Sequence, residues 1–302
     1  MRGGKDNALH GYVLIFLAGV IWGTIGLFVK ELEYSGATPV LTSLLRVSFA
    51  FVIMAVLCCV KYGVKTFSID GRTLLSCGLL GLICHGVYNI FYSLAVTMAG
   101  VSVSAVLLNI APVFTLFFSV ILFGEKFTWL KAVAIVINVI GCILTATNGE
   151  LDVRTVSVMG ILFGAGAGIC YALTAIIGRL AADKTNPFVM SMYSYFFAAL
   201  FLVVWMRPWQ QAVSFNTKIM VWSILYALIP TALAYILYYH GLQCVMESSK
   251  VPVIASVETV VAAVIGIVLY HEHLGSCSIL GIVLVLFSIV IMNVTLERHG
   301  RA

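Results

Sequence analysis

Two charged side chains lie inside long apolar stretches of this sequence. Arg46 follows Pro39 by about two helical turns, and Glu258 lies about two turns after Lys250. A charge in apolar surroundings is costly, so each needs a partner. The planar guanidinium of Arg46 can bind a carboxylate, and Glu258 can bind a cation or carry a proton. The alternatives are a snorkelling or ion-paired arginine and a structural glutamate held by hydrogen bonds.

A second set of candidates is polar or aromatic. His85 and Asn89 are four residues apart, hence on one face of a helix, and Asn109 lies in the next apolar stretch. The others are two tyrosine pairs with the same spacing and two single aromatic residues: Tyr88 and Tyr92, Tyr235 and Tyr239, Trp22, and Tyr171. If they line one cavity, they favour apolar or aromatic solutes and flat organic cations. The alternative is packing, because aromatic stripes are common in cores and at membrane interfaces.

Glu125 and Glu272 each end an apolar stretch and are gating or interfacial candidates. A carboxylate at the C-terminal end of a helix is unfavourable with the helix dipole, so a nearby cation should compensate it. Lys126 or Lys131 can do so for Glu125. Either the two glutamates only mark the ends of helices, or they form symmetry-related gate or dimer contacts.

The elements that must position these residues are membrane-spanning helices. Of the 302 residues, 62% are hydrophobic and 10% are charged, against about 25% charged residues in soluble domains. The mean hydropathy is +1.11. A span needs about 20 apolar residues, and ten fit: 11–29, 38–60, 73–95, 101–123, 128–147, 157–178, 187–206, 219–242, 251–270 and 275–295. Pro112 and Pro230 interrupt two of them and predict kinks. The expected fold class is all-α, a polytopic membrane protein of ten transmembrane helices.

Basic residues in the short loops predict the orientation. Twelve of the 17 lysines and arginines fall on the side of both chain ends and four on the other side, and Arg46 lies inside a span. Positively charged loops stay in the cytoplasm, so both termini are expected there. No small-residue cleavage site follows the first stretch, which predicts an uncleaved helix. We expect a multi-pass protein of a bacterial inner membrane, in contact with the lipid bilayer.

The two halves of the chain resemble each other. Glycines, aromatic residues and charges coincide when the chain is shifted by 147–149 residues: Gly11 with Gly160, Gly19 with Gly168, Trp22 with Tyr171, Lys30 with Arg179, Tyr88 with Tyr235, Tyr92 with Tyr239, and Glu125 with Glu272. Each half has five spans, an odd number, so the second half is inverted relative to the first. We expect two five-helix repeats, 1–150 and 151–302, around a midplane site that opens alternately to each face. Arg46 and Glu258 have uncharged counterparts, which makes them candidates for substrate recognition.

No other pattern is typical of a catalytic or cofactor site. The run His271-Glu272-His273 lacks the spacing of a zinc protease motif, the eight cysteines form no CxxC pair, and GxxxxGK[ST] does not occur. No basic cluster with interleaved aromatic residues suggests nucleic acid. We expect no catalytic residue, metal, cofactor or nucleic-acid partner. A homo-oligomer is possible but not required. An intramembrane enzyme and a channel are the less favoured alternatives.

Several segments carry a resemblance to a known family. They are Trp22-Gly23, the run from Phe123 to Thr128 (FGEKFT), Val257-Glu258-Thr259 and Glu272-His273-Leu274. Together with the duplication they resemble the ten-span EamA members of the drug/metabolite transporter superfamily, from about Gly11 to Met292. One departure is Thr259, where many members have proline. The resemblance implies a small-molecule substrate and an exporter of small metabolites, with amino acids as the first candidates. The alternative is efflux of organic cations or drugs, coupled to protons through Glu258.

Overall fold

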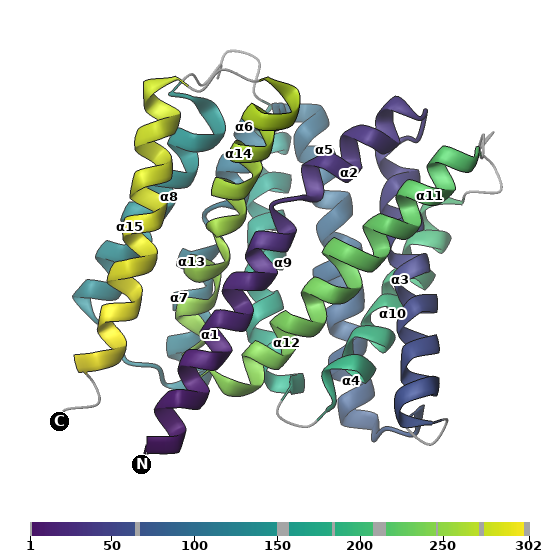
Figure 1. Ribbon diagram of the computed structural model, residues 1–302, viewed down its shortest axis with the longest axis horizontal. Helices are drawn as coiled ribbons and strands as arrows, with labels where there is room; N and C mark the ends of the chain where they lie inside the picture. The colour runs from purple at the N-terminus through teal and green to yellow at the C-terminus, as the bar shows by residue number, and fades with distance from the viewer. Residues whose placement is uncertain are drawn as a thin grey trace.

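The chain folds into a bundle of helices that run between two faces, with both chain ends at the same face, here called the terminus face (Figure 1). The computed structural model describes residues 2–63, 67–149, 157–182, 185–207, 216–245, 247–271 and 275–298, and every regular element in these ranges is helical. The first half contains α1 (Arg2–Trp22), α2 (Ile25–Tyr34), α3 (Pro39–Tyr62), α4 (Gly71–Leu79), η2 (Leu80–Val87), α5 (Tyr88–Ala99), α6 (Val101–Leu108), α7 (Ala111–Phe123) and α8 (Trp129–Thr147). The second contains α9 (Val158–Ala182), α10 (Pro187–Met206), α11 (Thr217–Tyr226), η4 (Ala227–Leu233), α12 (Ala234–Cys244), η5 (Ser248–Lys250), α13 (Val251–Ala255), α14 (Val257–Tyr270) and α15 (Ser276–Arg298).

These elements make up the predicted membrane spans. Within the described ranges, nine helical segments from Asn7–Tyr34 to Ser248–Tyr270 are long and apolar enough to cross a membrane, and α15 supplies a further apolar helix over Ser276–Met292. The predicted all-α, multi-pass fold is confirmed. The predicted boundary between the halves, at residues 150 and 151, lies outside the described residues.

Helices of the first half pack on helices of the second half in pairs that are related by approximate twofold symmetry. The first span packs on the eighth (α1 on α12), and its repeat-related pair packs likewise, the sixth on the third (α9 on α5). The second span packs on the seventh (α3 on α10) and the fifth on the tenth (α8 on α15), and each of these pairs is its own counterpart. Every one of these contacts joins the two halves, as inverted repeats around a common centre require.

Glycines at repeat-related positions allow two of the close crossings. A Cβ atom on Gly19 would lie 2.7 Å from the carbonyl oxygen of Ala255, and one on Gly168 would lie 2.8 Å from that of Leu107. Backbones can approach this closely only where a side chain is missing. Gly19 and Gly168 are 149 residues apart. The same contact is therefore built twice, by α1 on α13 and by α9 on α6.

Three spans are interrupted near their middle. α1 and α2 separate at Gly23 and Thr24, α6 and α7 separate after Leu108, and α13 and α14 separate at Ser256. The second and third breaks are repeat-related, because Asn109 lies 147 residues before Ser256. Pro112 lies in the first turn after the second break, in keeping with the expected kink. No sequence pattern predicted the first break, and the expectation of one continuous helix over 11–29 is corrected.

Two π-helical segments also occupy equivalent places. η2 begins at Leu80 and η4 at Ala227, 147 residues later, and Pro230 lies inside η4. In a π-helix each backbone hydrogen bond spans one residue more than in an α-helix, and such segments are frequent at functional sites. η2 carries His85, and each segment directly precedes the helix that bears one of the tyrosine pairs. The irregular backbone of the third and eighth spans therefore lies beside the candidate site.

Candidate functional site

An aromatic cluster occupies the centre of the bundle. The ring of Tyr235, on α12, lies 5.0 Å from that of Trp22 and 4.8 Å from that of His85. Three further tyrosine rings lie within 6.1 Å of it. Contacts of this kind, mostly tilted or edge-to-face, are favourable between aromatic rings. The cluster thus consists of Trp22, His85, Tyr195, Tyr235, Tyr238 and Tyr239.

The tyrosines of the third span lie next to this cluster. Tyr88 stacks on Tyr92 at 6.0 Å, and the ring of Tyr171, on α9, lies 6.2 Å from Tyr88. Tyr171 donates a hydrogen bond to Glu258 Oε1 at 3.3 Å. Tyr88 also lies close enough to Tyr235 for the two side chains to interact electrostatically. The structure therefore brings the two tyrosine pairs, Trp22 and Tyr171 to one region of the bundle.

Glu258 is positioned by the break in the ninth span. It lies in the first turn of α14, two residues after Ser256, and is half-buried. A carboxylate in the first turn of a helix is stabilised by the helix dipole. The break in the first span lies against it, because a Cβ atom on Gly23 would be 2.8 Å from the carbonyl oxygen of Glu258. Two interrupted helices therefore meet at the backbone of this residue.

Arg46 reaches the same region from α3. Its Nη1 donates a hydrogen bond to the Tyr226 hydroxyl at 3.1 Å, and the guanidinium lies 5.4 Å from the centre of that ring. Tyr88 lies close enough to interact electrostatically with both Arg46 and Glu258. Among the described residues, Arg46 and Glu258 form no ion pair with each other. A carboxyl group and a guanidinium group thus lie near Tyr88 without forming an ion pair with each other.

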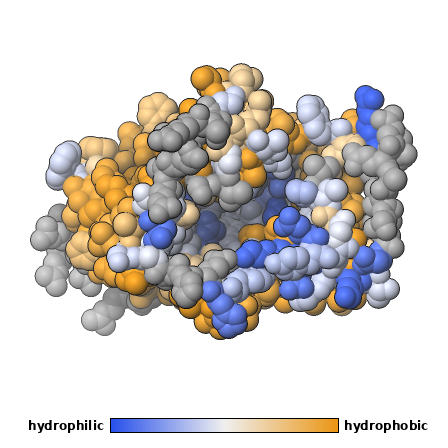
Figure 2. Space-filling model, turned by 90° about the horizontal axis from the view of Figure 1, so that it is seen from above, coloured by the Kyte–Doolittle hydropathy of each residue, from blue (hydrophilic) through white to orange (hydrophobic). Residues whose placement is uncertain are grey.

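Three buried polar atoms near Tyr235 have no hydrogen-bond partner among the residues that the structure describes. They are Trp22 Nε1, Arg46 Nε and His85 Nδ1. A buried polar group without a partner costs about 1–3 kcal/mol, so these groups are suited to bind water or a solute. Figure 2, which views the face opposite the termini, shows a hollow near the middle of the molecule with hydrophilic side chains in and around it.

The side chains of Asn89 and Asn109 form their hydrogen bonds away from the rings of the aromatic cluster. Asn89 accepts a hydrogen bond from Ser43 at 3.2 Å and donates one to the His85 carbonyl at 2.5 Å. With Ser43, Ser93, Trp205 and neighbours it lines a side pocket of about 270 Å³. Asn109 donates to the Ala105 carbonyl of its own helix at 2.9 Å. This bond satisfies Asn109 locally at the break between α6 and α7.

Glu125 is buried at the terminus face and is bound there by several donors. Arg179 Nη1 lies 2.8 Å from its Oε1, the Ser248 amide donates to Oε1 at 2.5 Å, and the Ser249 hydroxyl donates to Oε2 at 2.6 Å. The expectation that Lys126 or Lys131 compensates Glu125 is wrong, because Lys131 is bound to Glu247 instead. The ion-pair partner of Glu125 is Arg179 on α9. Glu272, the counterpart of Glu125, lies outside the described residues.

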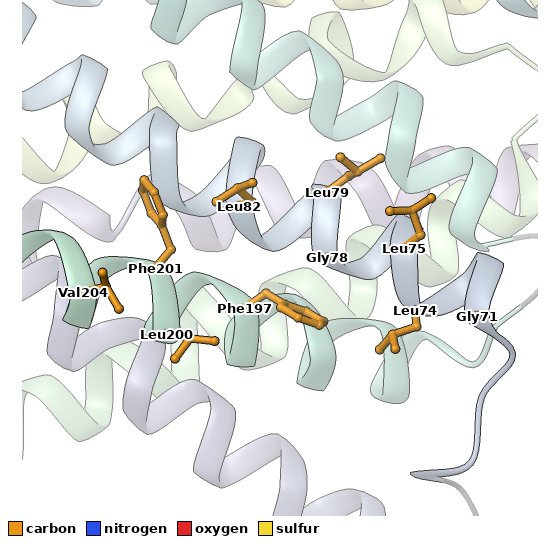
Figure 3. Close-up of a pocket in the computed structure, with 10 residues that line it drawn as sticks. All are labelled: Gly71, Leu74, Leu75, Gly78, Leu79, Leu82, Phe197, Leu200, Phe201 and Val204. Carbon is orange, nitrogen blue, oxygen red and sulfur yellow. The ribbon is translucent and has the colours of Figure 1, made fainter.

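An apolar groove on the described surface is not part of this site. It has a volume of about 630 Å³ and lies between α4, η2 and α10, where leucines and phenylalanines line it (Figure 3). None of its lining residues is a candidate site residue. With no charged side chain among those that line it, the groove suits the apolar face that a spanning protein presents to lipid.

Sequence reasoning missed three tyrosines at the centre. Tyr195 packs on His85 and Tyr235, Tyr226 binds Arg46, and Tyr238 packs on Trp22. Neither Tyr195 nor Tyr226 has a second tyrosine three or four residues away, so the spacing that marked the two tyrosine pairs does not single them out. Their positions follow only from how α10 and α11 are rotated in the bundle.

Ten spans in two inverted repeats, with interrupted helices and, among the described residues, an arginine and a glutamate that do not pair with each other, define a multi-pass integral membrane protein of transporter type. The model of the EamA-like transporter family matches residues 9–147 and 158–294, and this chain belongs to that family. The resemblance drawn from the sequence is thereby confirmed.

The relatives agree with this assignment. An uncharacterized transporter of Archaeoglobus fulgidus is 24% identical and covers 93% of this chain and 96% of its own. The uncharacterized transporter YwfM of Bacillus subtilis (strain 168) is 26% identical over 99% of this chain and 98% of its own. A protein of known crystal structure shares the fold with a TM-score of 0.82 at 14% identity, covering 94% of this chain and 98% of its own.

Proposed function

We propose that this transporter exports a small organic solute that carries a carboxylate and an ammonium group, an amino acid or a related compound. The observation that carries the proposal is the pair of opposite charges, Arg46 and Glu258, which flank the tyrosines without pairing. A guanidinium binds a carboxylate with matched geometry. A carboxylate with aromatic neighbours binds an ammonium group. A zwitterion satisfies both.

The mechanism we propose is alternating access. With the termini in the cytoplasm, the hollow faces outside, and the network of Glu125, Arg179 and Ser248 closes the cytoplasmic face. Solute enters when that network opens, binds between Arg46 and Glu258, and leaves through the hollow. The inverted repeats support this exchange, because the same helix contacts occur in both halves.

The test is counterflow in proteoliposomes with labelled amino acids, the corresponding amines and the corresponding organic acids. We expect zwitterions to exchange, Arg46→Gln to abolish their exchange, and Glu258→Gln to do the same. The protein needs no nucleotide for this. If no member of the panel moves although the protein is folded, the proposal is wrong.

A second candidate is proton-coupled efflux of organic cations. The observation that favours it is the set of tyrosines around Glu258, with Tyr171 bonded to it, since aromatic rings and one carboxylate suit a flat cation. In this case Arg46→Gln leaves transport intact, and Glu258→Gln abolishes its dependence on a pH gradient. The same proteoliposomes therefore separate the two candidates.

A further inference from the structure

A group of three charges lies beside Glu125 at the terminus face, and the function proposed above does not use it. Lys131 Nζ is 3.0 Å from Glu247 Oε1, and Lys250 Nζ is 2.6 Å from Glu247 Oε2. Both lysines are almost fully buried, at 2% and 1% exposure. Lys131 also donates to the Lys126 carbonyl at 3.1 Å. The three charges, here called the triad, join α8 to the segment that leads into α13.

The triad lies at a junction that must open if solute is to pass this face. η5 packs on α7 and α9, and Glu125 binds the backbone amides of Ser248 and Ser249 at its start. Glu247 directly precedes these residues, and Lys250 ends η5. Moving α13 away from α7 and α8 therefore breaks the ion pair between Lys131 and Glu247. A buried ion pair is expensive to break when its partners stay buried.

Part of this junction is repeated at the opposite face. Arg179 lies 4.4 Å from the centre of the Phe123 ring, and Lys30 lies 3.7 Å from that of Tyr270. Lys30 precedes Arg179 by 149 residues, and Phe123 precedes Tyr270 by 147. The same cation and aromatic pair thus occurs at both ends of the bundle. This part of the junction is symmetric.

The triad is not repeated. At the 147-residue offset Gly100 corresponds to Glu247, Val103 to Lys250, and Ser278 to Lys131, and none of these is charged. The packing of the described residues differs in the same way: α7 packs closely on η5, whereas α14 and α6 form no comparable contact. The three charges of the triad therefore have no charged equivalent at the repeat-related positions.

We propose that the triad of Lys131, Glu247 and Lys250 is a one-sided lock that makes the state closed at the terminus face the predominant resting state. Its residues position η5 and α13 and do not contact the solute. The two states of the transporter are then unequal in free energy even though the repeats exchange roles. This inference rests on the alternating access proposed above, and it assigns the resting bias to three named side chains.

The test follows the accessibility of one buried position. Ala175 lies on α9 one turn from Arg179, between that residue and Tyr171, and it is 1% exposed. We introduce Ala175→Cys into a variant in which the three cysteines that are not buried are replaced by serine: Cys59, Cys244 and Cys277. A membrane-impermeant thiol reagent is applied to either face in proteoliposomes. In the unmodified protein the state open at the terminus face is the minor state, and minor states are populated at about 0.1–10%. Loss of the lock raises that population, so we expect Glu247→Gln to increase labelling of the introduced cysteine from the terminus face about tenfold.

The controls separate a lock from a merely structural role. Glu33→Gln removes an exposed acid at the opposite face and should leave labelling unchanged. If Glu247→Gln does not fold, Glu247→Asp should give a smaller rise of the same sign. Unchanged labelling, or a rise that is equal from both faces, contradicts the proposal. Counterflow on the same variants keeps the two ideas distinct, because a failed lock leaves transport intact and a failed function moves no solute.

Discussion

Gly23 offers a test of how the candidate site is built. A Cβ atom on this residue would lie 2.5 Å from Val261 Cβ and 2.8 Å from the Glu258 carbonyl oxygen, both on α14. Overpacking of this kind costs about 1–3 kcal/mol. Its backbone φ is not positive, so alanine also gains about 0.4–1 kcal/mol by restricting the unfolded chain. We therefore expect Gly23→Ala to be destabilising by about 1–2 kcal/mol.

Gly26 provides the matched control, because it lies three residues further on with nothing within 4 Å of its position. Gly26→Ala should stabilise the protein by about 0.4–1 kcal/mol, the opposite sign. The measurement is thermal unfolding of both variants in the same detergent, followed by ligand binding. Since Gly23→Ala pushes α14 away from α1, binding should weaken as well. Equal stability of Gly23→Ala and Gly26→Ala would refute the close approach of the two interrupted helices.

Three further predictions concern packing and charge. Gly81→Ala should lower the unfolding temperature, because its Cβ would lie 2.3 Å from a carbonyl oxygen of α10, whereas Gly78→Ala, with its nearest neighbour at 3.7 Å, should not. Glu125→Ala should cost about 3–5 kcal/mol in chemical denaturation, since it leaves Arg179 without its carboxylate, and Glu125→Gln should cost less. Burial raises the pKa of the Glu247 carboxyl, but hydrogen bonds and charges from two lysines outweigh it and hold that pKa below its ordinary value of 4.5. The stability that Glu247 contributes is therefore complete above about pH 4.5 and lost as the pH falls through the lowered pKa; a pH titration of unfolding should show this loss, and Glu247→Gln should abolish it.

The sequence was sufficient to predict the bundle because hydropathy and repetition act along the chain. Apolar length defines a span, and an odd number of spans in each half defines the inversion. Glu258 and Arg46 stand out for the same reason, since a charge is conspicuous in an apolar stretch. Tyr88 and Tyr235 were found through their equivalence in the two halves.

The partners of these residues could not be predicted, because they depend on how the helices are rotated and where they break. Arg179 lies 54 residues from Glu125 in sequence and binds it all the same, whereas the adjacent lysine does not. Tyr226 reaches Arg46 from a helix 180 residues away. The break at Gly23 lies against α14, a contact that no local pattern encodes.

The most direct test of the central claim is binding of three matched ligands to the purified protein: phenylalanine, phenethylamine and 3-phenylpropanoate. They share an aromatic ring and differ in which charge they carry. Each charged hydrogen bond contributes about 1.5–3 kcal/mol, so phenylalanine should bind at least about tenfold more tightly than either analogue. Arg46→Gln should make phenylalanine bind no more tightly than phenethylamine. Glu258→Gln should make it bind no more tightly than 3-phenylpropanoate. Equal binding of all three ligands, or tight binding of the amine alone that ignores Arg46, would contradict the account.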